Sequence, residues 1–365
     1  MTTIPTTTEL GPDQQRLHDT MRRLAEVTST DAPVLSIYLD MRPEAHGESP
    51  GRRAALTVLR DRLRAIENTL EPHTTAQESV SADAARIHDF VESDDMRSVE
   101  GLAIFACSAQ DLWEVQSAGV PFDTHVSAGP GADLFQLARL SDAHTSVIVA
   151  IVDTNTLRLF VSRRGALVEQ PGRDEGSEEH ERSDQGGWSQ ARYQRHIDEQ
   201  DKRFAKEAAE AIERIMDSEK ATAVVLAGDE RAVPVLRQQL SERVLAAVAG
   251  REHIEMRAGR DEVEADVGPL LERLKSEASL TVADRVVAGV RAGDLGVAGA
   301  EPTMKALKLG QVDELVIVES ADLDEELRAE LIRQAALTDA RVEVIDQHAG
   351  LARFGGIGAT LRFRL

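Results

Sequence analysis

A chain of 365 residues is long enough for two or three domains, and 42% apolar residues are typical of a globular rather than a disordered protein. The formal net charge of −22 excludes a protein that coats nucleic acid by general electrostatics, so any contact with RNA requires local basic patches. No apolar run approaches the roughly 20 residues of a transmembrane helix, and the N-terminus lacks a signal-peptide pattern. Because the single Cys107 cannot form an internal disulfide, a reduced, cytoplasmic protein is expected.

The first segment, residues 1–140, alternates strand-like and helix-like patterns. An alternating pattern predicts a strand at Val34–Asp40. Gly101–Cys107 and Leu112–Gln116 are predicted as two further strands joined by a short polar turn. An amphipathic helix is predicted at Arg53–Leu70. The segment is therefore expected to form an α+β domain.

The second segment, residues 141–258, begins with apolar strands and continues into a long helix. Its predicted elements are, in chain order, strands at Thr145–Asp153, Thr156–Val161 and Ala166–Gln170, a polar loop at Pro171–Trp188, a helix at Ser189–Glu219, a strand at Ala223–Ala227 and a helix from Ala232. The helix carries one apolar stripe, which comprises Tyr193, Ile197, Phe204, Ala208, Ile212 and Ile215. This alternation predicts a three-layer α/β domain.

The third segment, residues 259–365, has shorter elements of both kinds. The predicted elements are helices at Val263–Ser276 and Ala283–Ala292, a loose stretch at Gly296–Gly299, a helix at Pro302–Leu309, a strand at Val312–Val318, a helix at Glu325–Thr338, a strand at Arg341–Ile345, a glycine turn at Phe354–Ala359 and a strand at Leu361–Leu365. Together they indicate a small α/β sandwich.

A glycine pair directly before the long helix is the most informative motif. It resembles the tip of the archaeal and eukaryotic peptide chain release factors, where Gly-Gly-Gln-Ser leads into a helix with the pattern Arg-aromatic-x-Arg. The matching residues are Gly186, Gly187, Ser189, Arg192, Tyr193 and Arg195. Trp188 stands where that family has its catalytic glutamine, and Gln190 follows two residues later.

Two further motifs support the resemblance in the expected order. Thr303–Leu315 is similar to a helix-turn-strand of the release-factor C-terminal domain, and Phe354–Phe363 resembles a glycine-rich run near the end of those proteins. The first segment matches only in its strand pattern and lacks the stop-codon-reading motifs. The chain is identified as a bacterial-type member of the release factor and Pelota superfamily.

The resemblance implies a fold and a function. The fold is three consecutive α/β domains: an α+β N-terminal domain (1–140), an RNase H-like middle domain (141–258) and a C-terminal α/β sandwich (259–365). The function is that of a ribosome-associated factor at the A site, which releases nascent peptide by peptidyl-tRNA ester hydrolysis in release or rescue. The partners are then rRNA, peptidyl-tRNA and a translational GTPase, with no DNA, membrane, metal or cofactor.

The implied catalytic tip is the run Gly186, Gly187, Trp188, Ser189 and Gln190. Ester hydrolysis needs a positioned water and donors for the developing oxyanion, and adjacent glycines let a backbone N–H approach where a Cβ would clash. By the same resemblance Arg192 and Arg195 bind RNA. The alternative, purely structural interpretation is that the glycine pair forms a surface linker before the helix.

Alternatives remain open at this tip and beside it. Looping out Trp188 and Ser189 brings Gln190 to the tip and preserves hydrolysis, whereas stacking of Trp188 on an rRNA base plugs the centre without catalysis. The second outcome corresponds to a hibernation or Pelota-like factor. Further along the helix Lys202, Arg203 and Lys206 are interpreted as a solvated face.

A third hypothesis is a metal-dependent nuclease. It would use Asp153, at the end of one predicted strand, and Asp229, in the turn after another. It requires a carboxylate cluster, and the spacing of acidic residues in the sequence does not supply one.

Overall fold

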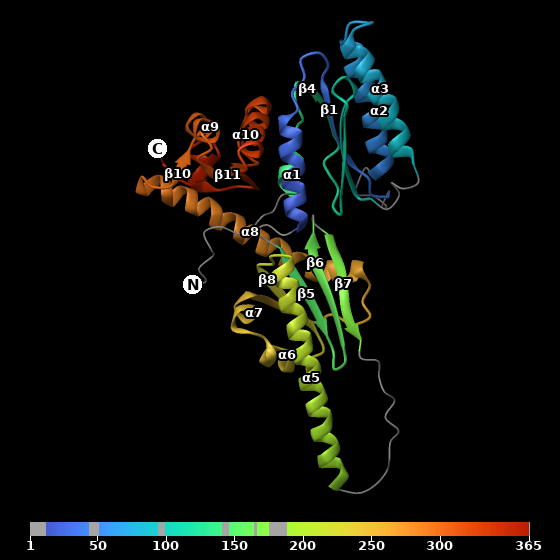
Figure 1. Ribbon diagram of the computed structural model, residues 1–365, viewed down its shortest axis with the longest axis vertical. Coiled ribbons are helices and arrows are strands. Elements are labelled where there is room, and N and C mark those ends of the chain that lie inside the picture. Colours follow the sequence, from blue (N-terminus) through green and yellow to red (C-terminus); the bar gives the residue numbers. More distant parts are fainter. Residues whose placement is uncertain are drawn as a thin grey trace. The chain divides into compact units, whose positions relative to one another are not determined.

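The computed structural model describes residues 12–43, 51–93, 99–140, 146–163, 166–174 and 188–364, with the side chains of 173–174 and 188–198 left undescribed. The chain folds into two compact units. One contains mainly Ala143–Arg163 and Leu167–Ala278, and the other mainly Arg16–Asp142 and Ser279–Leu365. Three separate sheets lie within these units, as Figure 1 shows.

The first sheet belongs to the second unit and has the order β3-β2-β1-β4. Its strands are β1 (Val34–Asp40), β2 (Gly101–Cys107), β3 (Leu112–Ala118) and β4 (His125–Gly129). β1 pairs antiparallel with β2 and β4, β2 pairs antiparallel with β3, and every residue of β1 and β2 is buried.

Helices cover both faces of this first sheet. They are α1 (Pro12–Glu26), α2 (Gly51–Thr69), α3 (Thr75–Glu92) and α4 (Phe135–Leu140), with the 3-10 turn η2 (Ser108–Gln110) between β2 and β3. One core contains residues of α2 and α3, whereas residues of α1 and α4 share another core on the opposite side. The predicted bounds of β1 and β2 are confirmed, but α1, α3, α4 and β4 were not predicted.

The sheet of the first unit has the order β7-β6-β5-β8-β9. Its strands are β5 (Val147–Val152), β6 (Thr156–Arg163), β7 (Ala166–Asp174), β8 (Ala223–Gly228) and β9 (Val248–Glu252). β5 runs antiparallel to β6 and parallel to β8, and β8 runs parallel to β9. The long apolar runs predicted to be strands are therefore at the centre of the sheet, where both faces are buried.

Two helical layers enclose this five-stranded sheet. The helices are α5 (Trp188–Ser218), α6 (Ala232–Gln239), α7 (Glu242–Ala247) and α8 (Arg260–Ala292). Residues of α5, α6 and α7 share a core with alternate residues of the central strands, and the other alternate residues share a second core with the first part of α8. The predicted three-layer architecture is confirmed.

The third sheet belongs to the second unit and has the order β10-β13-β11-β12. Its elements are β10 (Gly296–Ala298), α9 (Ala300–Lys308), β11 (Val312–Val318), α10 (Glu325–Leu337), β12 (Arg341–Ile345), α11 (Ala349–Ala352) and β13 (Ile357–Leu361). Residues of α9 and α10 share a core with one face of the sheet, and those of α11 and the last part of α8 with the other. The α/β sandwich is confirmed.

Three predictions in this region are wrong. The two helices predicted at Val263–Ser276 and Ala283–Ala292 form the single helix α8, because the intervening residues include neither glycine nor proline and the helix continues into buried Val282 and Ala283. The stretch Gly296–Gly299 is not loose, because β10 pairs with β13. The last strand is β13, which ends at Leu361, rather than Leu361–Leu365.

The proposed domain boundaries after residues 140 and 258 stay predictions. Among the described residues, none of the helices is both long enough and apolar enough to span a bilayer.

Candidate functional site

The candidate tip lies at the beginning of α5. Gly186 and Gly187 fall outside the described residues, and the backbone of α5 begins with Trp188. Ser189 and Gln190 follow within its first turn, and the helix is 31 residues long. In Figure 1 the N-terminal half of α5 extends beyond the sheet of β5, β6 and β7.

The C-terminal half of α5 anchors the helix to the core. Its buried side chains are those of Phe204, Ala205, Ala208, Ala209, Ile212 and Met216. The predicted stripe is thus confirmed from Phe204 to Ile212, with Ile215 partly buried, whereas Tyr193 and Ile197 have undescribed side chains. At 1.5 Å per residue, Trp188 lies about 24 Å along the helix from Phe204. The helix therefore carries its first turn well away from its anchor.

An ion pair fixes the other end of α5 to the sheet. Two guanidinium nitrogens of Arg163, at the end of β6, donate to the two carboxylate oxygens of Glu219 at 2.5 and 3.3 Å. Glu219 directly follows α5 and its side chain is only 11% exposed. A bidentate pair of this kind restricts the orientation of both partners, so it holds the helix in register with β6.

The basic residues in the middle of α5 lie on its outer side. Lys202, Arg203 and Lys206 are exposed, whereas Phe204 and Ala208 between and beyond them face the core. This arrangement is that of a solvated helix face. The side chains of Arg192 and Arg195, the two predicted RNA contacts, are among those left undescribed.

The two acidic residues of the nuclease hypothesis have structural partners. One carboxylate oxygen of Asp153 accepts the N–H groups of Asn155 and Thr156 at 2.9 and 2.7 Å, and thereby closes the β5–β6 turn. One oxygen of Asp229 accepts N–H groups at the start of α6, at 2.7 and 3.1 Å.

Asp153 and Asp229 follow the neighbouring strands β5 and β8, and the N–H of Asp229 donates to the carbonyl of Val152 at 2.9 Å. Within the described part of the chain, His, Cys, Asp and Glu side chains form no group of three that could hold a metal ion. Turn closure and helix capping are therefore the roles that the geometry assigns to these two acids.

The two C-terminal motifs form tight turns. The helix α9 ends before Gly310, which has φ of 65° and whose N–H donates to Leu307 at 2.8 Å. In the second motif Gly355 and Gly356 have φ of 72° and 75°, and the carbonyl of Gly356 accepts the N–H of Val318 at 2.8 Å. Positive φ explains the glycines at these positions. The glycine turn predicted at Phe354–Ala359 is confirmed at Phe354, Gly355 and Gly356, whereas the residues from Ile357 onward belong to β13.

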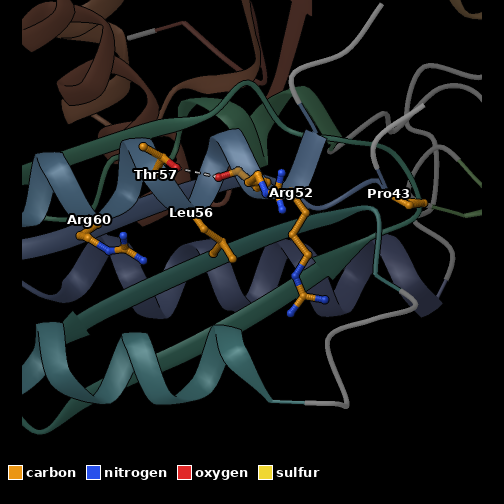
Figure 2. A pocket seen from close by; sticks show the side chains of 6 residues that line it. Pro43, Arg52, Leu56, Thr57 and Arg60 are labelled. Atoms are coloured by element: carbon orange, nitrogen blue, oxygen red, sulfur yellow. Dashed lines mark hydrogen bonds between the residues drawn. The ribbon is translucent and has the colours of Figure 1, made fainter. Parts of the chain in front are cut away.

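Sequence reasoning missed a hollow beside the start of α2. A cavity of about 570 Å³ is lined by Pro43, Arg52, Arg53, Leu56, Thr57 and Arg60 (Figure 2). The sequence feature that could have predicted this basic surface is the high arginine content of α2 in a strongly acidic chain. The helix was selected for its apolar stripe alone.

The five-stranded sheet with the order β7-β6-β5-β8-β9, between two helical layers, is an RNase H-like α/β fold. Residues 133–269, which contain this sheet and α5, match the model of the bacterial archaeo-eukaryotic release factor family 10. This segment is therefore similar to a bacterial family of archaeo-eukaryotic release factors.

Several solved structures are similar to the chain at low identity. An archaeal translation termination factor, aRF1, is 18% identical over 98% of this chain and 100% of its own, with a TM-score of 0.28. Archaeal Pelota, from a ribosome-bound model with ABCE1, is 14% identical over 95% and 94%, with a TM-score of 0.42. Dom34 of S. cerevisiae is 9% identical over 98% and 94%, with a TM-score of 0.43. No curated protein has a matching sequence.

Proposed function

We propose that this protein is a ribosome-associated translation factor that acts at the A site and directs the start of α5 toward peptidyl-tRNA. The observation that carries the proposal is the glycine pair Gly186-Gly187 directly before Trp188, where α5 begins, within the segment that matches the release-factor family. The buried C-terminal half of α5 and the Arg163–Glu219 pair support it, because they provide a rigid base for a projecting tip.

For the chemistry at the tip we propose hydrolysis of the peptidyl-tRNA ester. A water oxygen attacks the carbonyl carbon, the bond to the tRNA ribose oxygen breaks, and that oxygen takes up a proton as the peptide leaves with a carboxyl end. The first four N–H groups of a helix have no intrahelical acceptor, so the N–H groups at the start of α5 can stabilise the oxyanion. Gln190 would position the water.

Hydrolysis requires a local change at the start of α5. In the helix, Gln190 is two residues after Trp188, which places it about 200° further around the axis. To take the place directly after the glycine pair, Gln190 needs the first turn to unwind. The first turn is the part of a helix with the fewest backbone hydrogen bonds, so unwinding is least costly there.

A second candidate function is occupation of the A site without hydrolysis. The observation that favours it is the helical backbone at Trp188, which leaves an aromatic residue directly after the glycine pair. An indole can stack on an unpaired rRNA base without placing any group beside the ester.

Contacts along the helix and in the last domain complete the proposal. Arg192 and Arg195 are three residues apart, so they lie on one side of the helix and can contact successive phosphates of rRNA. In the last domain the resemblance of Thr303–Leu315 to a release-factor motif supports a translational GTPase as a further partner.

Peptide release from stalled ribosomes tests the proposal. Wild-type protein is added to 70S or 50S complexes that carry labelled peptidyl-tRNA, and the freed peptide is measured together with ribosome co-sedimentation. We expect Gly187→Ala and Gln190→Ala to reduce release by about 100-fold or more. Gln200→Ala, a matched change on the same helix beyond the tip, should leave release unchanged.

The same experiment separates the two candidates. One outcome would favour non-hydrolytic occupation over hydrolysis: the wild-type protein binds ribosomes tightly but releases no peptide, and Trp188→Ala weakens ribosome binding roughly 5- to 150-fold. Absence of ribosome binding by the wild-type protein would reject both candidates.

A further inference from the structure

The helix α2 concentrates positive charge in a chain of net charge −22. Within its 19 residues there are two acids, Asp61 and Glu67, and five arginines. The arginines are Arg52, Arg53, Arg60, Arg62 and Arg64. A local excess of this sign is the kind of basic patch that an acidic protein needs to contact a polyanion.

The spacing on α2 aligns part of this charge along one side. Arg53, Thr57, Arg60 and Arg64 follow each other at intervals of four, three and four residues, and all four are exposed. Such intervals place side chains one above another on a helix. Arg53 and Arg64 are therefore about 17 Å apart along the axis, which makes a basic stripe rather than a point charge.

The cavity beside the start of α2 adjoins this stripe. Its volume is about 570 Å³, and the described residues that line it include Arg52, Arg53 and Arg60. Figure 2 shows Arg52, Leu56 and Arg60 reaching from the same side of α2, with Pro43 in the chain before the helix. The hollow thus combines guanidinium groups with the apolar surface of Leu56.

Packing holds this basic surface in place. Ala55, Leu59 and Leu63 of α2 are buried in a core that the helix shares with β1 and β2. Because this side of α2 faces the core, the helix cannot rotate, and its opposite side stays exposed. One terminal nitrogen of Arg52 donates to the carbonyl of Val91 at 2.7 Å, in the last turn of α3. This bond ties Arg52, one of the residues that line the cavity, to α3.

The neighbouring Arg42 is paired with an acid of β1 and bonds to the start of α2. Its guanidinium forms two hydrogen bonds with the Asp40 carboxylate at 3.0 and 2.7 Å, so its charge is balanced locally. The carbonyl of Arg42 accepts the N–H of Arg52 at 2.9 Å, which ties the start of α2 to the end of β1. Arg42 therefore fixes the position of the start of α2 beside β1.

We propose that this surface of α2, comprising the cavity and the stripe Arg53–Thr57–Arg60–Arg64, binds the phosphate backbone of RNA. Phosphate follows from the chemistry, because guanidinium groups bind phosphate oxygens in pairs of hydrogen bonds. The extended stripe fits a chain of phosphates better than a single anion. The choice of RNA rests on the proposed ribosomal function. Such contacts position a protein on RNA without selecting its sequence.

Salt-dependent RNA binding by the full chain tests this inference. A fluorescent RNA hairpin is titrated across roughly 50–200 mM KCl, and purified ribosomes are co-sedimented at the same salts. For Arg53→Gln/Arg60→Gln we expect the slope of log K against log salt to fall in magnitude by about 1.4 to 1.8, since each lost phosphate contact accounts for about 0.7 to 0.9. At the lowest salt we expect roughly tenfold weaker binding.

The variants are chosen to keep the fold. Glutamine has a helix propensity close to that of arginine, and Arg52 is left intact because it bonds to α3. The matched control is Arg237→Gln/Arg291→Gln, which removes the same charge from two exposed positions on α6 and α8. Circular dichroism and thermal unfolding verify that both proteins remain folded.

Three outcomes would overturn the inference: no RNA binding by the wild-type protein, an unchanged slope in the α2 variant, or an equal loss in the control. Polyglutamate, added at the same concentration of negative charge as the RNA, is a polyanion without phosphate groups. If it displaces the RNA, the proposal that the surface binds RNA phosphates is wrong. The failure of the proposed function is distinguishable, because RNA binding is measured without ribosomes. A reduced slope for RNA with no ribosome binding rejects only the ribosomal function, whereas normal release with an unchanged slope rejects only this surface.

Discussion

At the scale of single residues, Tyr38 illustrates a polar group that is buried with its partner. It lies in the middle of β1, is fully buried, and packs edge-on against Phe105 and Phe122 at ring distances of 5.8 and 5.2 Å. Its hydroxyl donates to the carbonyl of Asp133 at 2.6 Å. Burial, with a smaller effect of the Asp133 carboxylate, raises the pKa of Tyr38 well above its ordinary value of 10.0.

This raised pKa predicts a loss of stability in alkali. Above about pH 10 the unfolded chain releases the Tyr38 proton while the folded chain retains it, so the free energy of unfolding falls as pH rises. We expect Tyr38→Phe to cost about 1 kcal/mol at neutral pH, through the lost hydrogen bond, and to show a shallower decline above pH 10. Urea unfolding at several pH values measures both effects. An identical decline in the wild-type protein and in the Tyr38 variant would contradict the prediction.

At the scale of elements, the turn before β13 depends on two adjacent glycines in different surroundings. Gly355 and Gly356 both have positive φ, at 72° and 75°. A Cβ added at Gly355 would meet no atom within 4 Å. One added at Gly356 would lie 2.4 Å from the Cβ of Ala321, which is closer than two carbon atoms can approach.

The two alanine variants should therefore differ in stability. Gly355→Ala introduces only the left-handed conformation, which costs about 1–2 kcal/mol. Gly356→Ala adds overpacking against Ala321, for roughly 1–3 kcal/mol more. Thermal unfolding of both variants measures the difference. Equal destabilisation would show that the backbone conformation alone determines the cost.

The predicted elements succeeded where the local pattern and the tertiary environment agree. β1, β2, β11 and β12 have the predicted bounds because most of their residues are apolar and buried. β10 was missed because its three residues acquire strand geometry only by pairing with β13. The helix α8 was divided in two because its apolar residues serve different cores along its length. A pattern of one period cannot describe a helix whose buried side changes.

At the scale of the whole molecule, the chain forms two compact units that are not consecutive in sequence. The unit with the five-stranded sheet interrupts the other, which contains the first and third sheets. Each unit has buried aromatic residues of its own, such as Phe204 in the first and Phe105 in the second. A substitution in the core of one unit should thus change the stability of that unit alone.

We expect two components in the calorimetric unfolding of the full chain. Phe204→Ala should lower the midpoint temperature of one transition, and Phe105→Ala that of the other. Each truncation of a buried phenylalanine should reduce the free energy of unfolding of its own unit by roughly 3–5 kcal/mol. The two variants are matched controls for each other. A single transition that shifts as a whole in both variants would show that the units unfold together.

The candidate tip could be identified from sequence alone, because its glycines, aromatic residue and arginines are neighbours along the chain. The surface on α2 could not, because it depends on which side of the helix is buried. The same holds for Asp153 and Asp229, which resemble possible ligands in sequence but cap turns in the structure.

The sequence by itself determined the main strands, the long helix and the family to which the Gly186-Gly187 motif points, because these features are local. Only the tertiary structure decided that α5 is anchored through its C-terminal half, that its helical backbone begins at Trp188, and that α2 presents arginines outward. The physical reason is burial. Apolar contacts between distant segments select one side of each helix for the core and leave the other available for a partner.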